Sequence, residues 1–359
     1  MILPLLGILG TAFLILRAIL PAPAPLSGAT AATAAASEDA GDAVRLMTRA
    51  LEALRAARAA AGLPIDARTD LNRTGLIGLE ASPTTTSLGH LEAKRTTANP
   101  AFAGALVRML REAGVVRGDA VAIGASSSFP GLVVATLCAA QAMGVRALPI
   151  VSLGASNWGA NNPRWTGLDI IESLNRAGVL DVSILAASIG GEGDAGLDLA
   201  PEGRTLLRRR IEAWGGEFLA PADLPAAVAA RMKLFEDGLA GTPIKAFVNV
   251  GGSWVDMGTD PEVLKLRPGF NPAADVILPP PDRRGLIQAW AARGVPVVHL
   301  LFIKGLCDRY AIPWDPMPLA PAAPVGRAAS RGARDVLAAA FAALAAAGLV
   351  WIAHRRRLV

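Results

Sequence analysis

The chain is poor in the residues that most often hold metals or form cross-links. Its 359 residues include three histidines, two cysteines and one tyrosine. There is no C-x-x-C pair and no metal-type spacing of Cys and His, so we expect no metal site. Cys138 and Cys307 both lie in apolar runs, which predicts buried free thiols, with a disulfide between them as the alternative.

Two nucleotide-binding fingerprints are also missing. No G-x-G-x-x-G follows the first expected strand, which argues against a dinucleotide site. No G-x-x-x-x-G-K-[ST] is present either, which argues against an NTPase. The sequence therefore predicts no cofactor.

Charged residues are few: they make up 18% of the chain, against 52% hydrophobic residues. The apolar excess lies at the ends, since residues 1–20 are apolar apart from Thr11 and Arg17, and residues 336–353 carry no charge. Each stretch approaches the roughly 20 residues of a spanning helix. The basic residues 354–357 that follow would be cytoplasmic. We therefore predict a protein of the bacterial inner (cytoplasmic) membrane whose main domain faces the periplasm or cell exterior.

These ends also fit other interpretations. Residues 1–20 could be a cleaved signal peptide, with A-x-A sites in the Ala-rich stretch 29–36, or a buried core helix. Residues 336–353 could be an amphitropic helix or a packing helix. The net charge of +5 comes largely from arginines near the C-terminus, so it indicates anionic lipid rather than nucleic acid as a partner.

Between the ends, apolar strand-like runs alternate with helical segments. The clearest unit is a strand at 120–123, a turn of glycine and serines, and a helix from Pro130 to Gly144. Further strands are expected at 145–151, 182–186, 245–250 and 295–303. This alternation predicts an α/β fold: a single doubly wound, mostly parallel sheet of five or six strands, Rossmann-like, flanked by N- and C-terminal transmembrane helices.

The domain organisation follows from these boundaries. It consists of a transmembrane helix or signal anchor (1–20), a Pro/Ala linker (21–36), an extracytoplasmic α/β domain (37–312), a Pro-rich linker (313–335), a second transmembrane helix (336–353) and a basic cytoplasmic tail (354–359).

Four loops rich in small polar residues follow the expected strands: 124–128, 154–162, 188–194 and 249–256. In a parallel sheet they emerge at one edge, where open α/β sheets bind ligands. Their backbone N–H groups are suited to bind a phosphate or a carboxylate. Three indole side chains could form apolar walls: Trp158, Trp165 and Trp254. Four acidic side chains could bind an amine: Asp169, Glu192, Asp194 and Asp256. The alternative is that small residues simply make tight turns. The candidate ligand-binding residues are Gly124, Ser128, Asn157, Trp158, Asn161, Asn162, Gly190, Gly191, Glu192, Gly252, Ser253 and Asp256.

The turn after the first strand also resembles a nucleophile elbow. Its sequence is G-A-S-S-S, but Ser128 stands where G-x-S-x-G requires glycine. A serine hydrolase also needs a base. His90, in the irregular segment 65–98, could fold over the serines, whereas His299 lies inside an apolar strand and fits a core residue. Ser126, Ser127 and His90 are therefore candidate catalytic residues.

Three sequence segments suggest a family: GASSSFPG (124–131), LGASNWGANNPRWTGLDI (153–170) and FVNVGGSW (247–254). Together with the two apolar ends, they resemble the poly-gamma-glutamate system protein family. The resemblance implies a membrane-anchored accessory protein that takes part in the synthesis or export of poly-γ-glutamate. This molecule is a capsule-type polymer of the cell envelope. Such a protein would bind the anionic polymer, a glutamate-like ligand or a synthase partner. The alternatives are a serine-dependent γ-glutamyl hydrolase or transferase, and a purely structural scaffold of the synthase complex.

Overall fold

The computed structural model describes residues 27–238 and 242–319, with side chains from residue 36 onward. Both segments predicted to cross the membrane, 1–20 and 336–353, lie outside these residues. Within the described part of the chain, no helix is long and apolar enough to cross a membrane. The longest described helix, α2 (Ser27–Ala60), has the length but carries charged side chains along its course. The prediction of an inner-membrane protein with flanking transmembrane helices is therefore wrong for the structure as described.

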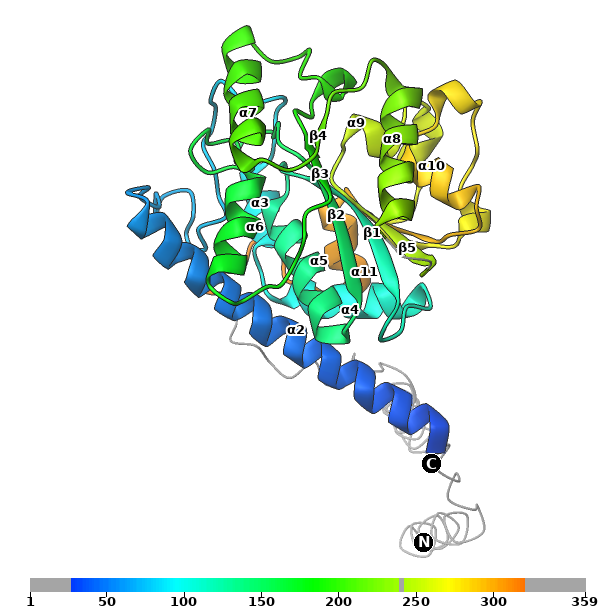
Figure 1. Ribbon diagram of the computed structural model, residues 1–359. Coiled ribbons are helices and arrows are strands. Elements are labelled where there is room, and N and C mark those ends of the chain that lie inside the picture. The colour runs from blue at the N-terminus through cyan, green and yellow to red at the C-terminus, as the bar shows by residue number, and fades with distance from the viewer. Residues whose placement is uncertain (1–26, 239–241, 320–359) are drawn as a thin grey trace, which may run out of the picture. The chain divides into compact units, whose positions relative to one another are not determined.

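The sheet has seven strands in the order β4-β3-β2-β1-β5-β7-β6. Strands β1 to β5 are labelled in Figure 1. Every neighbouring pair is parallel except β6–β7. The strands are β1 (Ala120–Ser126), β2 (Arg146–Ser152), β3 (Ala186–Ser188), β4 (Phe218–Leu219), β5 (Ile244–Val250), β6 (Gly269–Asn271) and β7 (Val297–Leu300). The α/β class and the mostly parallel sheet are confirmed, but five or six strands is too few. The edge strand β6 is only three residues long, too short for an apolar period to mark it.

Helices cover both faces of the sheet. In Figure 1, α8 (Leu224–Asp237) and α10 (Leu286–Ala291) lie on one side, and α5 (Pro130–Met143) and α6 (Gly167–Arg176) on the other. The remaining α-helices are α3 (Leu91–Thr97), α4 (Ala101–Glu112), α7 (Pro201–Trp214), α9 (Trp254–Met257) and α11 (Ile303–Tyr310).

Successive residues of β1 serve the two faces in turn. Val121 and Ile123 pack with α4 and α5, whereas Ala120 and Ala122 pack with α8 and α10. All seven residues of β1 are buried. A strand covered on both faces explains the nearly uncharged run that marked this segment in the sequence.

The boundaries of the predicted domain differ from the observed ones. Helix α2 (Ser27–Ala60) includes residues 27–36 of the predicted linker 21–36, because this stretch is rich in alanine, the residue with the highest helix propensity. Residues 313–319 pack onto the domain: Asp315 pairs with Arg95, and the Asn72 amide donates to the Pro316 carbonyl at 2.9 Å. The two cysteines are free and buried, as expected.

Candidate functional site

A cavity lies at the carboxyl edge of the sheet, where the chain order changes direction. Strand β1 has β2 on one side and β5 on the other, so the loops that follow β1 and β5 diverge and leave a crevice between them. A pocket of about 630 Å³ opens there, and residues from the loops after β1, β2, β3, β5 and β7 line it. The prediction that these loops meet at one edge is confirmed.

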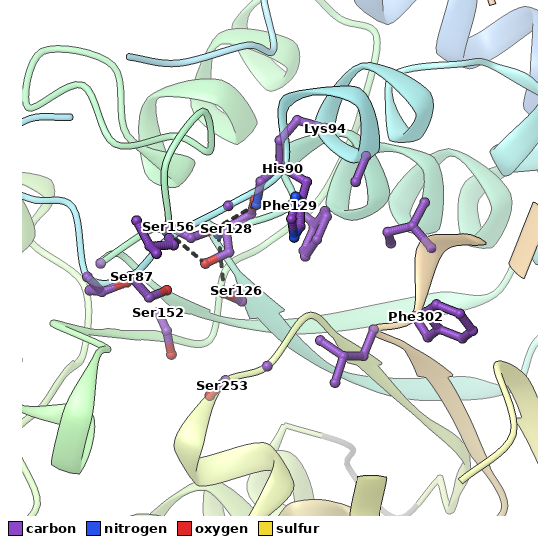
Figure 2. Close-up of a pocket in the computed structure, with 18 of the residues that line it drawn as sticks. Ser87, His90, Lys94, Ser126, Ser128, Phe129, Ser152, Ser156, Ser253 and Phe302 are labelled. Atoms are coloured by element: carbon purple, nitrogen blue, oxygen red, sulfur yellow. Dashed lines mark hydrogen bonds between the residues drawn. The ribbon is translucent and has the colours of Figure 1, made fainter. Parts of the chain in front are cut away.

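Hydroxyl groups line the floor of this pocket (Figure 2). They come from the ends of three strands, β1, β2 and β5, or the loops after them: Ser126, Ser128, Ser152, Ser156 and Ser253. Three of these serines are linked in a chain. The Ser128 N–H donates to Ser126 Oγ at 3.2 Å, and the Ser156 N–H donates to Ser128 Oγ at 3.0 Å. The floor is therefore polar, uncharged and held in place by its own backbone.

Lys94 closes one wall of the pocket, close to Ser156 and Ser128 (Figure 2). It is only 3% exposed, yet no carboxylate in the described part of the chain pairs with it. Its Nζ lies 2.7 Å from Ser156 Oγ, donates to the Ser128 carbonyl, and stands 3.7 Å from the centre of the Phe129 ring. Burial without a counter-charge lowers the pKa of Lys94 to about 7. The amine therefore loses its proton near neutral pH.

The segment 78–94, which carries Lys94, is fixed across the sheet edge by the loop after β2. Asn161 is completely buried: its Oδ1 accepts from the Leu79 N–H, and its Nδ2 donates to the Leu79 carbonyl, both at 2.8 Å. Its Nδ2 also donates to Thr85 Oγ1 at 2.9 Å. Asn157 also bonds the segment 78–94 through both atoms of its amide. Its Oδ1 accepts from the Gly89 N–H at 3.0 Å, and its Nδ2 donates to the Glu80 carbonyl. Both asparagines therefore position the wall of the pocket and do not line it.

A buried ionic cluster supports the other side of the floor. Ser152 Oγ lies 3.1 Å from Ser188 Oγ, which donates to Asp194 Oδ1 at 2.7 Å. Arg231, on α8, donates to Asp194 Oδ2 at 2.6 Å and to Ser188 Oγ at 2.9 Å. Arg231 and Asp194 are 1% and 2% exposed, so this pair is shielded from water. The cluster ties the loop after β3 to α8 directly behind the pocket.

Asp256 lies behind the floor, next to β1. A Cβ at Gly124 would come within 2.3 Å of Asp256 Oδ2, so the strand needs glycine at that point. Burial raises the pKa of Asp256 to about 7, although Arg231 lowers it. The predicted ligand-binding residues Gly124 and Asp256 thus pack against each other and do not line the pocket.

The predicted site residues divide into two groups. Those that line the pocket are His90, Ser126, Ser128, Gly191, Glu192, Gly252 and Ser253. Those that lie elsewhere are Gly124, Ser127, Asn157, Trp158, Asn161, Asn162, Gly190 and Asp256. Most of the second group have local roles. The backbone N–H of Trp158, for example, donates to the Leu79 carbonyl at 2.8 Å. The Asn162 side chain accepts from the backbone N–H of Arg164 at 2.9 Å.

The predicted Ser–His arrangement is not assembled. Ser127 Oγ is buried with no hydrogen-bond partner among the described residues and points at Gly167, where a Cβ would lie 2.4 Å away. His90 is exposed at the start of α3, and no hydrogen bond joins it to Ser126 or Ser127 in the described part of the chain. His299 is buried and accepts from Asn249 Nδ2 at 2.9 Å, and burial lowers its pKa to about 4.

Several lining residues were not among the predicted ones. Ser156 lies inside the predicted loop 154–162 but carries no signal that separates it from its neighbours. Lys94 and Ser152 were not expected either. Of the three predicted indoles, Trp254 lines the pocket, whereas Trp158 and Trp165 do not. Trp165 belongs to the hydrophobic core. The acid Asp169 pairs with Arg210 at 2.9 Å. Among the described residues, no group of three His, Cys, Asp or Glu side chains could hold a metal ion.

Lys94 is expected to make stability rise with pH above neutrality. Between about 7 and its ordinary pKa of 10.5, Lys94 is mainly neutral in the folded chain and protonated in the unfolded one. Unfolding then takes up a proton, so the free energy of unfolding should increase by about 1–2 kcal/mol from pH 7 to about pH 8.5. Urea unfolding at both pH values would measure this. The increase should be absent from Lys94→Met and retained in Lys245→Met, which changes an exposed lysine. Equal pH slopes in all three proteins would contradict the assignment.

Comparison with known proteins adds no relative from which function could be transferred: no family model, curated protein or solved structure matches the chain.

Proposed function

We propose that the protein binds a γ-glutamyl chain in the pocket at the carboxyl edge of the sheet. The observation that carries this proposal is the division of the pocket into an uncharged hydroxyl floor and a rim with charges of both signs. A γ-glutamyl chain has the same division: neutral amide groups in its backbone, a carboxylate on each residue, and an ammonium group at one end.

The floor suits the amide part of such a ligand. Hydroxyl groups both donate and accept hydrogen bonds, as an amide does. Because burial lowers the pKa of Lys94 to about 7, this lysine carries only part of its positive charge at neutral pH and attracts a carboxylate less than an ordinary lysine would. Exposed apolar side chains at the mouth, Leu88 and Phe302, provide surface for the methylene groups of a glutamyl residue.

The rim suits the charged parts of the ligand. Lys304 from α11 and the exposed His90 provide donors for a carboxylate, and Glu92, Glu192 and Asp198 provide acceptors for an ammonium group. Ion pairs at such exposed positions contribute little each, so they would orient the ligand more than they would strengthen binding. Together with the resemblance to the poly-gamma-glutamate system family, this supports an accessory role in handling that polymer.

Isothermal titration calorimetry on the full-length chain tests the proposal. The ligands are a γ-linked glutamate tetramer, the α-linked tetramer, free glutamate and inorganic polyphosphate. We expect the γ-linked tetramer to bind at least about tenfold more tightly than the other three, a difference of about 1.4 kcal/mol. Lys304→Met should weaken binding of the γ-linked tetramer, whereas Lys245→Met, an exposed lysine outside the pocket, should not.

Equal affinity for polyphosphate would mean that the pocket attracts anions in general. An absence of binding to any of the four ligands would overturn the proposal and favour the scaffold alternative, in which no small ligand takes part.

A further inference from the structure

We propose that Ser156 and Lys94 form a nucleophile–base pair that cleaves an amide bond of the bound chain by acyl transfer to water. This inference rests on the proposed function, because it assigns chemistry to the ligand's amide group. It replaces the serine and histidine suggested by the sequence with a different serine and a different base.

The first support is geometric. Lys94 Nζ and Ser156 Oγ are 2.7 Å apart, within the range for direct proton transfer between a nucleophile and its base. Both side chains line the same pocket, as Figure 2 shows. The pair therefore lies where a ligand amide would bind.

The second support is the protonation state of the amine. A lysine can act as a base only when it is neutral, and an ordinary lysine at pH 7 is almost fully protonated. Lys94 is buried against the Phe129 ring, with no carboxylate partner in the described part of the chain, and its pKa falls to about 7. A carboxylate beside it would restore the proton, so the absence of one among the described residues suits a base better than a structural ion pair.

The third support is the way the two residues are held. Hydrogen bonds cross between the lysine-bearing segment and the serine-bearing loop on both sides of Ser156. The Thr86 N–H donates to the Ala155 carbonyl, and the Asn157 N–H donates to the Ser87 carbonyl, both at 2.9 Å. The backbone of Ser156 is also fixed through Ser128 Oγ. Such positioning is what a nucleophile and its base require, because a small misplacement lowers the rate steeply.

The reaction balances with water as the only co-reactant. Ser156 Oγ forms a bond to the amide carbon while Lys94 Nζ takes the hydroxyl proton. The C–N bond then breaks and Lys94 passes that proton to the leaving nitrogen, which departs as an amine. Water attacks the resulting ester, and Lys94 takes a proton from it. The ester C–O bond breaks, Ser156 recovers its hydroxyl proton, and the acyl group leaves as a carboxylic acid.

The test uses the full-length chain with two probes. A fluorophosphonate reports the nucleophile, because Ser156 Oγ would bond to phosphorus as fluoride leaves. A γ-linked glutamate tetramer reports cleavage, measured by mass spectrometry of the shorter products. Peptide mapping should place the phosphonate on Ser156, and the labelling rate of the unaltered protein should rise through about pH 7 as Lys94 loses its proton. This pH profile needs no substitution, so it holds even if a variant fails to fold.

The variants then separate catalysis from structure. Ser156→Ala should lose both labelling and cleavage, and Lys94→Met should slow both by about 100-fold or more and flatten the pH profile. Ser183→Ala changes an exposed serine outside the pocket and should behave like the unaltered protein. A purely structural role for Lys94 would leave the pH profile in place.

The outcomes distinguish this inference from the proposed function. Tight binding of the tetramer with no cleavage and no label on Ser156 would overturn the nucleophile–base pair and leave the binding function standing. A label on Ser156 with the expected pH profile, but no affinity for the tetramer, would support the reactive pair and overturn the proposed ligand. A label on another residue, or a rate that does not change with pH, would also overturn the pair.

Discussion

Replacing Arg231 with methionine is expected to lower the free energy of unfolding by about 3–5 kcal/mol, because it leaves the buried charge of Asp194 without its partner. Arg231 is 1% exposed and donates to Asp194 and to Ser188, so the ion pair is shielded from water. Equilibrium denaturation in urea would measure the loss.

A matched control is Arg293→Met. Arg293 also pairs with a carboxylate, Glu236, but both side chains are half exposed. An exposed pair contributes about 0–1 kcal/mol, so this change should cost little. Changing Asp194 to asparagine in the Arg231→Met background should recover part of the lost stability, since no buried charge then remains unpaired. Similar losses for Arg231→Met and Arg293→Met would contradict the buried-pair argument.

Replacing Asn161 with alanine is expected to cost about 2–3 kcal/mol of stability and to reduce binding of the γ-linked tetramer at least about tenfold. The stability loss arises because the Leu79 N–H loses its partner, while the Leu79 carbonyl loses one of its two donors and keeps the Trp158 backbone N–H. The binding loss arises because Asn161 holds the segment that carries Lys94 over the pocket, although Asn161 does not line the pocket itself. Urea unfolding and calorimetry would measure the two effects on the same protein.

Asn175→Ala provides the control for this experiment. Like Asn161, Asn175 bonds both backbone groups of one residue: its Oδ1 accepts from the Val182 N–H at 3.2 Å, and its Nδ2 donates to the Val182 carbonyl at 2.8 Å. Asn175 does not line the pocket. It should therefore lower stability without changing affinity. Unchanged affinity in Asn161→Ala would show that the segment 78–94 does not need this anchor to form the binding site.

The end of β1 and the turn after it explain why two of the three serines at 126–128 line the pocket and the third does not. A strand and a turn rich in small residues place all three serines, 126–128, at the correct edge of the sheet. Strand β1 ends at Ser126, and the chain then turns at Ser127 and Ser128. Ser126 and Ser128 line the pocket, while Ser127 between them points into the core toward Gly167. The sequence shows the hydroxyls but not which of them the neighbouring helix covers.

The sequence by itself determined the α/β class, the mostly parallel sheet and the edge at which the pocket lies. Those features depend on local patterns: apolar runs, glycine and serine turns, and the rule that parallel strands end at one edge. It also indicated a membrane anchor from the two apolar ends and the basic tail, but no helix among the described residues is long and apolar enough to cross a membrane.

Only the tertiary structure decided the chemistry of the pocket. Lys94 and Ser156 are 62 positions apart in the chain, and hydrogen bonds between the segment 78–94 and the loop after β2 bring them to 2.7 Å. Burial of the amine and the shift of its pKa depend on that contact and on the Phe129 ring, which comes from a third segment. Local propensities carry no information about such encounters, because they act within a few residues, whereas desolvation is set by everything that folds around the group.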